Sequence, residues 1–404
     1  MGEGEGGGED EAVRQDHWHK SRLEMNNGIQ VVILSAGTGY RLTPYSIGRP
    51  KVLCPVCNSP LLVRLLVQLN AAGIRGAVLA LPPMPIEIQD AAKAMAPAGF
   101  HLRLFFPDRK TNNKVAIVRS LMKSSTSSVL VIYGDSLLSV DFRALIRFHN
   151  RAKKLGGVAT ILYHRPFDTR VPEKDNRTHH GIMSVSTRGI VTRFIEKPKV
   201  SQIGPGFDLA NAAVFICERS FLEQPEFRKA QDFSFDIFQP AILRQMPVHG
   251  FDIGAGFRFD VGSISRLYEA NIKSIRRELE PPLLSREVNG RIWIGQNSTC
   301  KLTQLNPPVL LGNNVTIHNS ARIGPDVVIG DGTVINQGVT MCRSLLMKAC
   351  LVKRDVSLDY CILGDNCIIN DALTLPRFTV IGPDSVLGGG DWPNIAARKE
   401  YAYV

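Results

Sequence analysis

Long hydrophobic runs are absent from this sequence of 404 residues. None approaches the roughly 18–20 apolar residues that a membrane span requires. The N-terminal segment is acidic and glycine-rich, whereas a secretory signal would be basic and then apolar. Eight cysteines are too few for the dense disulfide framework of small secreted proteins. We therefore expect a cytoplasmic protein with no membrane partner, in which residues 1–26 form a disordered acidic tail.

An excess of negative charge is also lacking, since the formal net charge is +11. Basic and aromatic residues are not interleaved as they are on nucleic-acid-binding platforms, so we expect no nucleic-acid partner. A basic cleft for small anionic substrates and an ordinary solvated basic surface remain alternatives. Hydrophobic residues make up 44% of the chain, which allows two or three domains with their own cores.

Cys54 and Cys57 form a CxxC pair. A zinc or redox role would need a second CxxC or a His pair at metal-ligand spacing, and the sequence has neither. Free cysteine is often a small buried hydrophobic residue, and we favour that interpretation here.

Strand-like and helix-like segments alternate from residue 29 to residue 270. Such alternation predicts an α/β fold with a doubly wound, mixed but mostly parallel sheet, whose ligands lie at the carboxyl ends of the strands. We place this first domain at residues 27–275 and a linker at residues 276–291. The predicted strands are Ile29–Leu34, Gly76–Leu81, Leu102–Phe106, Val129–Tyr133, Val158–His164 and Ala212–Cys217; the predicted helices are Pro60–Ala72, Ile86–Met95, Lys114–Lys123 and Phe142–Lys154.

A six-residue repeat replaces this alternation in the last quarter of the chain. Aliphatic residues recur with this period in two runs, often followed by glycine: Leu311, Ile317, Ile323, Ile329 and Ile335, then Leu363, Ile369, Leu375, Ile381 and Leu387. The period is typical of hexapeptide solenoids, whose coils stack aliphatic side chains inward. We predict a parallel β-helix over residues 292–392, followed by a tail at residues 393–404. Because the second run is out of phase with the first, we expect an insertion or longer loop between them.

The segment VVILSAGTGYRLTPYSIGRPKVLCP, residues 31–55, combines an apolar strand with a glycine loop and two cations. Gly37 and Gly39 leave the backbone N–H groups accessible, which suits close approach to a polyphosphate. Arg41 and Lys51 can neutralise charge on phosphoryl oxygens.

Two acidic residues follow apolar strands in this domain. Asp135 lies in Tyr133-Gly134-Asp135-Ser136, and Asp260 lies in Phe259-Asp260-Val261-Gly262. Carboxylates at the carboxyl edge of a sheet can hold Mg²⁺, which prefers oxygen ligands. Each motif taken alone is also compatible with an ordinary turn.

Glu196 and Lys197 stand side by side before a proline, in the motif Phe194-Ile195-Glu196-Lys197-Pro198. The proline favours an extended conformation for Lys197. An acid and a base there can accept a hydroxyl proton and bind a phosphate, or simply form a solvated edge strand. Asn211 begins another apolar strand, and its amide suits either a turn or a polyol ligand.

Taken in order, SAGTGYRL with PKVLCPV, then YGDS, FIEKP, NAAVFIC and FDVGS, resemble the motifs of the sugar-1-phosphate nucleotidylyltransferases, which make nucleoside-diphosphate sugars. The likeness covers residues 29–272. The hexapeptide region resembles the left-handed β-helix that many of these enzymes carry after a Rossmann-like nucleotidyltransferase domain.

The resemblance implies an Mg²⁺-dependent enzyme whose partners are an NTP and a sugar 1-phosphate, of the glucose- or mannose-1-phosphate type, and which self-associates as a homo-oligomer through its β-helix. It implies the following roles: Leu34, Ala36, Gly37 and Gly39 at the nucleotide; Arg41 and Lys51 as catalytic cations on the phosphates; Asp135 and Asp260 as metal ligands; Gly181, Glu196, Lys197 and Asn211 at the sugar phosphate.

Departures from the family pattern keep two alternatives open. Tyr40 replaces the usual threonine before the arginine, and residues 108–119 carry bulky and charged residues where relatives have a small-residue loop. His179 and His180 precede Gly181, where a tyrosine is common. A catalytically weakened regulatory paralogue that binds a nucleotide sugar is one alternative; an acyltransferase using His318 in the solenoid is the other.

Overall fold

The structure is a computed structural model, and it describes residues 28–35, 39–46, 49–107, 113–165, 177–279 and 285–388. The expected tails at residues 1–26 and 393–404 lie outside these ranges. Contacts divide the chain into two compact units. Unit 1 comprises Met1–Gly37, Leu65–Gly134 and Leu138–Arg258, and unit 2 comprises Thr38–Arg64, Asp135–Leu137 and Phe259–Val404. The loop predicted to bind phosphate therefore groups with the C-terminal part of the chain.

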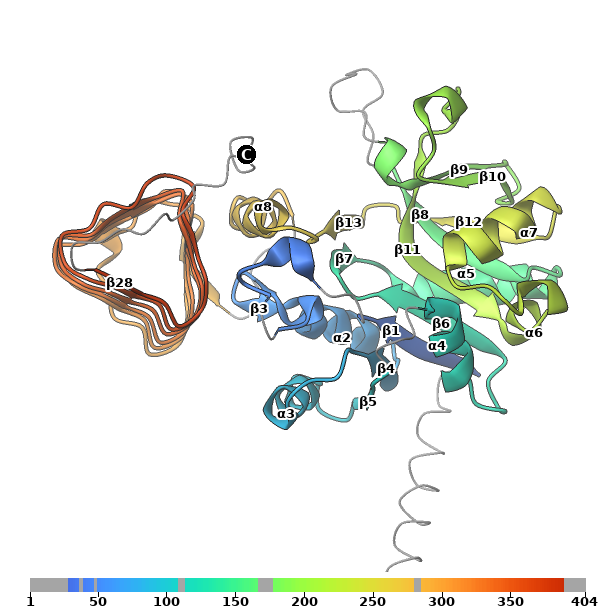
Figure 1. The fold of residues 1–404 in the computed structure, drawn as a ribbon, viewed down its shortest axis with the longest axis horizontal. Coiled ribbons are helices and arrows are strands. Elements are labelled where there is room, and N and C mark those ends of the chain that lie inside the picture. The colour runs from blue at the N-terminus through green and yellow to red at the C-terminus, as the bar shows by residue number, and fades with distance from the viewer. Residues whose placement is uncertain are drawn as a thin grey trace, which may run out of the picture. The chain divides into compact units, whose positions relative to one another are not determined.

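Unit 1 is built on a nine-stranded mixed sheet (Figure 1). The order β10-β9-β11-β6-β1-β4-β5 is extended by β8, which pairs with β11 and β12. β1 is parallel to β4 and β6, whereas β11 is antiparallel to β6, β8 and β9. The strands are β1 (Ile29–Leu34), β4 (Gly76–Ala80), β5 (His101–Phe105), β6 (Ser128–Tyr133), β8 (Ala159–His164), β9 (Gly181–Val185), β10 (Val191–Glu196), β11 (Leu209–Glu218) and β12 (Val248–Asp252).

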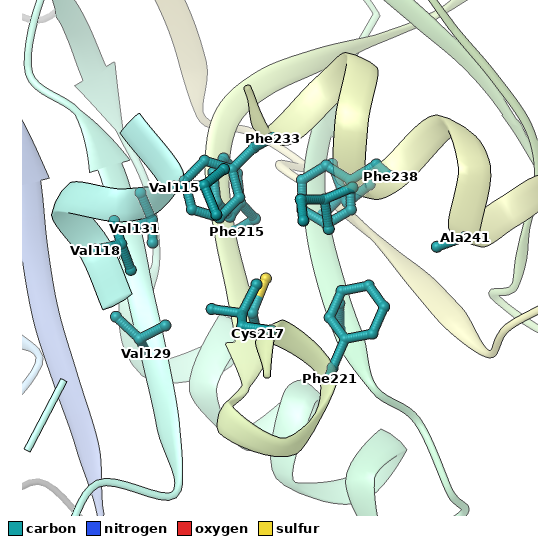
Figure 2. Close-up of a cluster of buried hydrophobic side chains, with 14 of the residues drawn as sticks. Val115, Val118, Val129, Val131, Phe215, Cys217, Phe221, Phe233, Phe238 and Ala241 are labelled. Atoms are coloured by element: carbon teal, nitrogen blue, oxygen red, sulfur yellow. The ribbon is translucent and has the colours of Figure 1, made fainter. Parts of the chain in front are cut away.

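Both faces of this sheet are covered, as the continuous hydrophobic strands predict. Val31, Val32 and Ile33 alternate between the faces, and each is at most 2% exposed. Aromatic residues fill one face, where Phe215 packs against Phe233 and Phe238 (Figure 2). The helical segments are α2 (Leu61–Ala71), α3 (Ile86–Ala94), α4 (Lys114–Leu121), α5 (Phe142–Lys154), α6 (Arg219–Leu222), the π-helix η7 (Phe233–Phe238) and α7 (Gln239–Leu243). The predicted doubly wound α/β fold is confirmed, and predicted helix and strand ends differ from the observed ones by only a few residues.

Unit 2 contains the parallel β-helix, whose coils form stacked triangles in Figure 1. Its first sheet also begins with an antiparallel strand, β14 (Arg286–Asn289), within the segment that the sequence pattern assigns to the linker. The first sheet holds β15 (Ile292–Ile294), β16 (Val309–Leu311), β19 (Val327–Ile329), β22 (Ser344–Leu346), β25 (Ile362–Leu363) and β27 (Val380–Ile381); the second holds β17 (Thr316–Ile317), β20 (Val334–Ile335), β23 (Leu351–Val352), β26 (Ile368–Ile369) and β28 (Val386–Leu387); the third holds β18 (Arg322–Ile323), β21 (Thr340–Cys342) and β24 (Ser357–Asp359).

The two runs of the six-residue repeat are joined without an insertion. In the first sheet the stacked residues Leu311, Ile329, Leu346, Leu363 and Ile381 follow one another after 18, 17, 17 and 18 residues. The expectation of an inserted loop is therefore wrong, because two coils are each one residue short. The shortened steps run from Met341 to Leu346 and from Leu358 to Leu363, all four of which point into the core.

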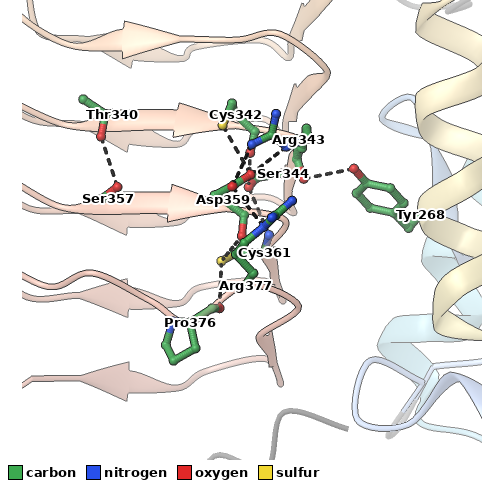
Figure 3. A network of polar contacts seen from close by, with 10 residues as sticks. All are labelled: Tyr268, Thr340, Cys342, Arg343, Ser344, Ser357, Asp359, Cys361, Pro376 and Arg377. Carbon is green, nitrogen blue, oxygen red and sulfur yellow. Dashed lines mark hydrogen bonds and ion pairs between the residues drawn. The ribbon is translucent and has the colours of Figure 1, made fainter. Parts of the chain in front are cut away.

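The shortened coil corners lie against helix α8 (Ile264–Ile275) of the same unit. Tyr268 donates its hydroxyl hydrogen to Arg343 O at 3.1 Å (Figure 3). Its ring also lies near the ring of Tyr360, with the centroids 5.7 Å apart. Asp359 accepts hydrogen bonds from Arg343 and forms an ion pair with Arg377, which ties three successive coils together. The loss of one residue in each corner coincides with the face that receives α8.

We predict that Ile329→Ala destabilises the chain by about 2–5 kcal/mol, since Ile329 is 0% exposed inside the coil stack. Val386→Ala, at a site that is 63% exposed, should change the free energy of unfolding by less than about 0.5 kcal/mol. Urea unfolding of both variants measures this difference. Equal midpoints would contradict the inward orientation of the repeat.

Candidate active site

The segment after β1 carries the two predicted phosphate-binding cations in short 3₁₀-helices. Arg41 lies in η1 (Tyr40–Leu42) and Lys51 begins η2 (Lys51–Leu53). Gly39 precedes η1 with a φ of 67°, a conformation that glycine adopts without strain, and its carbonyl accepts a hydrogen bond from Ser46 Oγ at 2.8 Å. Leu34 ends β1 with 7% exposure. Ala36 and Gly37, the other predicted nucleotide contacts, lie outside the described residues.

Two neighbouring strands bring the predicted metal ligands together. Asp135 directly precedes β7 (Ser136–Ser139), and Asp260 ends β13 (Phe257–Asp260). These strands pair in a two-stranded sheet, and Val261 N donates a hydrogen bond to Asp135 O at 3.2 Å. The two acids, 125 positions apart in the sequence, therefore come from adjacent backbone.

The predicted cations lie beside these acids. Lys51 Nζ is 3.7 Å from Asp135 Oδ2. A Cβ atom placed on Gly262 would lie 3.0 Å from Arg41 Nη2 and 3.0 and 3.1 Å from the carboxylate oxygens of Asp260. Glycine at this position thus leaves the space between the guanidinium and the carboxylate open. All four predicted charged residues belong to unit 2 and form one cluster.

This cluster fits a magnesium ion on the chemistry of its donors. Asp135 and Asp260 offer carboxylate oxygens, and the Asp135 side chain remains 33% exposed. Within the described ranges no group of three or more His, Cys, Asp or Glu residues is arranged to hold a metal alone. Mg²⁺ commonly binds through one or two carboxylates and takes its other ligands from phosphate and water. Two acids next to two cations that are predicted to bind phosphate are consistent with this mode of binding.

A second cluster, within unit 1, contains the residues predicted to hold the sugar phosphate. Glu196 and Gly181 are paired across β10 and β9. A Cβ atom on Gly181 would lie only 2.4 Å from Glu196 Oε2 and 3.5 Å from Asn211 Cβ. Glycine is therefore required for the Glu196 carboxylate to occupy its position, and Gly181, Glu196 and Asn211 are immediate neighbours.

Lys197 and Asn211 are set by irregular backbone in this second cluster. Lys197 has a φ of 48°, which is uncommon for a residue with a side chain, and its N–H donates to His180 O at 3.0 Å. Asn211 Oδ1 accepts from Ala213 N at 2.8 Å, where the pairing of β11 with β8 is interrupted. Such deviations concentrate at functional sites.

Lys114 and Asp232 complete this cluster, and the sequence motifs did not identify them. Lys114 Nζ is 2.8 Å from Asp232 Oδ2 and lies 5.1 Å from the centroid of the Tyr133 ring. Burial raises the pKa of Asp232, but the Lys114 ammonium and two backbone N–H groups outweigh it, so the net pKa is lowered. The only signal in the sequence was the unusual charge in residues 108–119, of which 108–112 lie outside the described ranges.

The pKa of the Glu196 carboxyl is shifted in the opposite direction to that of Asp232. Burial raises its pKa, and the negative charge of Asp232 adds to the increase. A hydrogen bond with Ser234 and the ammonium groups of Lys197 and Lys114 oppose the shift only in part. A carboxyl group held in this balance is a suitable partner for a ligand hydroxyl.

The structure also shows the surroundings of the CxxC pair and of His318, for which the sequence left other roles open. Cys54 and Cys57 are at most 1% exposed, and burial raises the pKa of each thiol to about 12, so both are protonated packing residues. His318 lies exposed on the β-helix, where its Nδ1 accepts a hydrogen bond from Ser320 N at 3.2 Å within a local turn. Within the described ranges, none of the helices has the length and hydrophobicity that a bilayer crossing needs.

Fold and site together define a nucleotidyltransferase followed by a parallel β-helix. The sequence matches the family described as "Nucleotidyl transferase" over residues 30–277 and the "GMPPB C-terminal domain" over residues 305–389. The chain therefore belongs to the nucleotidyl transferase family.

Full-length relatives extend this similarity over both parts of the chain. A mannose-1-phosphate guanyltransferase of Hypocrea jecorina is 30% identical over 376 residues, which is 88% of this chain and 92% of the relative. The catalytic subunit beta of mannose-1-phosphate guanylyltransferase from Drosophila pseudoobscura pseudoobscura is 27% identical over 372 residues, or 90% of each chain. The mannose-1-phosphate guanyltransferase of Gibberella zeae is 28% identical over 369 residues, which is 88% of this chain and 92% of the relative.

His164, at the end of β8 in unit 1, should make the protein acid-sensitive. It is 8% exposed, and its Nε2 has no hydrogen-bond partner among the described residues. Burial, together with the positive charges of Arg258 and His180, lowers its pKa from 6.5 to about 3. Below pH 6.5 the unfolded chain therefore binds a proton that the folded chain does not, and stability falls as the pH drops from 6.5 towards 3.

We predict that His164→Gln flattens the dependence of the urea unfolding midpoint on pH between 6.5 and 4, because the glutamine side chain cannot be protonated in this range. Urea midpoints measured across this range provide the check. The matched variant His318→Gln, at an exposed position, should keep the slope of the unaltered protein. Identical slopes for all three proteins would show that His164 is not the buried neutral group.

Proposed function

We propose that this chain transfers a guanylyl group from GTP to mannose 1-phosphate, releasing pyrophosphate and forming GDP-mannose. The observation that carries the proposal is the cluster of Arg41, Lys51, Asp135 and Asp260, which is assembled by the Val261–Asp135 hydrogen bond within a nucleotidyl transferase chain. The substrates are inferred from the names of relatives that align over 88–90% of the chain.

The reaction exchanges one phosphorus–oxygen bond for another. An oxygen of the sugar 1-phosphate forms a bond to the α-phosphorus of the NTP, and the bond from that phosphorus to the bridging oxygen of the β-phosphate breaks. Pyrophosphate leaves with the electron pair of that bond. The attacking oxygen is already anionic near neutral pH, so positioning and charge neutralisation account for most of the catalysis.

Each cluster has a separate task in this proposal. Arg41 and Lys51 neutralise the charge on the phosphates of the NTP. Glu196 accepts a hydrogen bond from a sugar hydroxyl, Lys197 pairs with the sugar phosphate, and Asn211 contacts the sugar. Asp135 and Asp260 would hold Mg²⁺, which when bound supplies positive charge to the phosphoryl oxygens.

Incubating the purified protein with each NTP and with mannose or glucose 1-phosphate tests the proposal. We expect pyrophosphate from GTP and mannose 1-phosphate in the presence of Mg²⁺, and a loss of at least about 100-fold in kcat for Asp135→Asn and Asp260→Asn. Asp90→Asn, at an exposed helix position, is the matched control.

Three outcomes of this experiment distinguish the alternatives. Turnover that survives in the Asp135 and Asp260 variants would refute the metal assignment. Release of pyrophosphate from another pair of substrates would correct the base or the sugar. No turnover with any pair, combined with thermal stabilisation by GDP-mannose, would identify a regulatory paralogue that binds the nucleotide sugar.

Gly181 provides a test of the sugar-phosphate cluster. The methyl group of Gly181→Ala would meet the Glu196 carboxylate, so we expect kcat/KM for mannose 1-phosphate to fall about 10-fold or more while KM for GTP changes little. Gly204→Ala is the matched control, because no atom lies within 4 Å of its added Cβ. Steady-state kinetics with each substrate varied separately give the answer; equal effects on both substrates would place Gly181 outside this task.

A further inference from the structure

The segment that carries Arg41 and Lys51 contacts the β-helix at three positions, all within unit 2. Arg49 donates hydrogen bonds to the carboxylate of Asp365 and to the hydroxyl of Tyr45. The other two contacts join neighbouring parts of the same segment to the coils: Asn58 Nδ2 donates to Ile329 O at 2.8 Å, and a Cβ atom on Gly382 would lie 3.2 Å from Pro44 Cβ.

These contacts all lie at the carboxyl ends of strands in the first sheet of the β-helix. Ile329 is the last residue of β19, Asp365 lies just after β25, and Gly382 lies just after β27. The amino ends of the strands in this sheet face α8. There Arg276, the residue after α8, forms a bidentate ion pair with Asp326, just before β19. One sheet therefore contacts the phosphate-binding segment at the carboxyl ends of its strands and α8 at their amino ends.

Asp365 is itself held firmly in its coil. The residue is 5% exposed, its Oδ1 accepts a hydrogen bond from Lys348 N at 3.3 Å, and its carbonyl accepts from Asp384 N at 2.8 Å. The Arg49 side chain is 25% exposed, and Tyr45 is 2% exposed. A charge-assisted pair with this much burial is costly to break from one side, because the remaining charge is left without a partner.

The segment needs such external support because its own structure is slight. Its 3₁₀-helices have three residues each, and each closes through two local hydrogen bonds, such as Leu42 N to Gly39 O in η1 and Cys54 N to Lys51 O in η2. Only Pro50, with φ fixed near −69°, separates Arg49 from Lys51. The position of Arg49 therefore limits where Lys51 can lie.

We propose that Asp365 is a positioning residue: by holding Arg49 it fixes the phosphate-binding segment, so that the β-helix takes part in nucleotide binding. This inference rests on the proposed function for the identity of the ligand, GTP, but the contacts and their effect on the segment do not depend on it.

The test compares full-length Asp365→Asn with Asp326→Asn. In this matched control a similarly buried β-helix carboxylate, which pairs with Arg276 at the end of α8, is neutralised instead. Both variants should lower the unfolding midpoint. Asp365→Asn should weaken GTP binding, measured by calorimetry with Mg²⁺, by about tenfold and speed hydrogen exchange of the backbone in residues 49–54. Asp326→Asn should leave both within about twofold of the unaltered protein.

A second variant shows whether Asp365 acts through Arg49. If it does, GTP should bind to Arg49→Met and to the double variant Arg49→Met/Asp365→Asn with the same affinity. Unchanged GTP affinity and exchange in Asp365→Asn, or equal changes in both carboxylate variants, would overturn the proposal. Faster exchange in Asp365→Asn alone, in a protein that neither binds nor uses GTP, would support the positioning role and reject the proposed function.

Discussion

The hydrogen bond from Val261 N to Asp135 O is the constraint on which the cluster of Arg41, Lys51, Asp135 and Asp260, proposed to bind the phosphates, depends. It fixes β13 beside the start of β7, and so places the two acids on adjacent backbone. Two like charges are unfavourable neighbours unless cations offset them, and Arg41 and Lys51 supply that compensation. The arrangement is therefore balanced only when the segment after β1 holds both cations in place.

Much of this architecture could be predicted from local pattern. β1 is apolar from Val31 to Leu34 and buried on both faces, and the six-residue repeat specified which β-helix residues point inward. The pattern failed at Met341–Leu346 and Leu358–Leu363, where each step is one residue short. A period read from the sequence shows that the phase has changed, but a loss of two residues and a gain of four give the same phase. The register of the stacked strands shows that two residues were lost, one in each of two coils.

The candidate site likewise contains residues that local motifs predicted and residues that they did not. Glycines and charged residues in short motifs were predictable, since Gly181 beside Glu196 and Gly262 beside Asp260 reflect close approaches that only glycine permits. The pairs Lys114–Asp232 and Arg49–Asp365 were not, because their partners are joined by topology across 118 and 316 positions. No local pattern marks a residue whose role is set by a distant partner, and both pairs involve charged residues that would otherwise be ordinary surface positions.

The β-helix then has a structural reason to accompany this catalytic chemistry. A short loop cannot hold two cations rigidly by its own hydrogen bonds, and electrostatic stabilisation of a phosphoryl group is effective only if the charges are fixed before the reaction. A stack of coils with fully buried aliphatic residues such as Val309 and Leu363 is a rigid support. Because one sheet of that stack contacts the segment that carries Arg41 and Lys51 through Asp365 and Ile329, it constrains the side of the cluster from which the cations come.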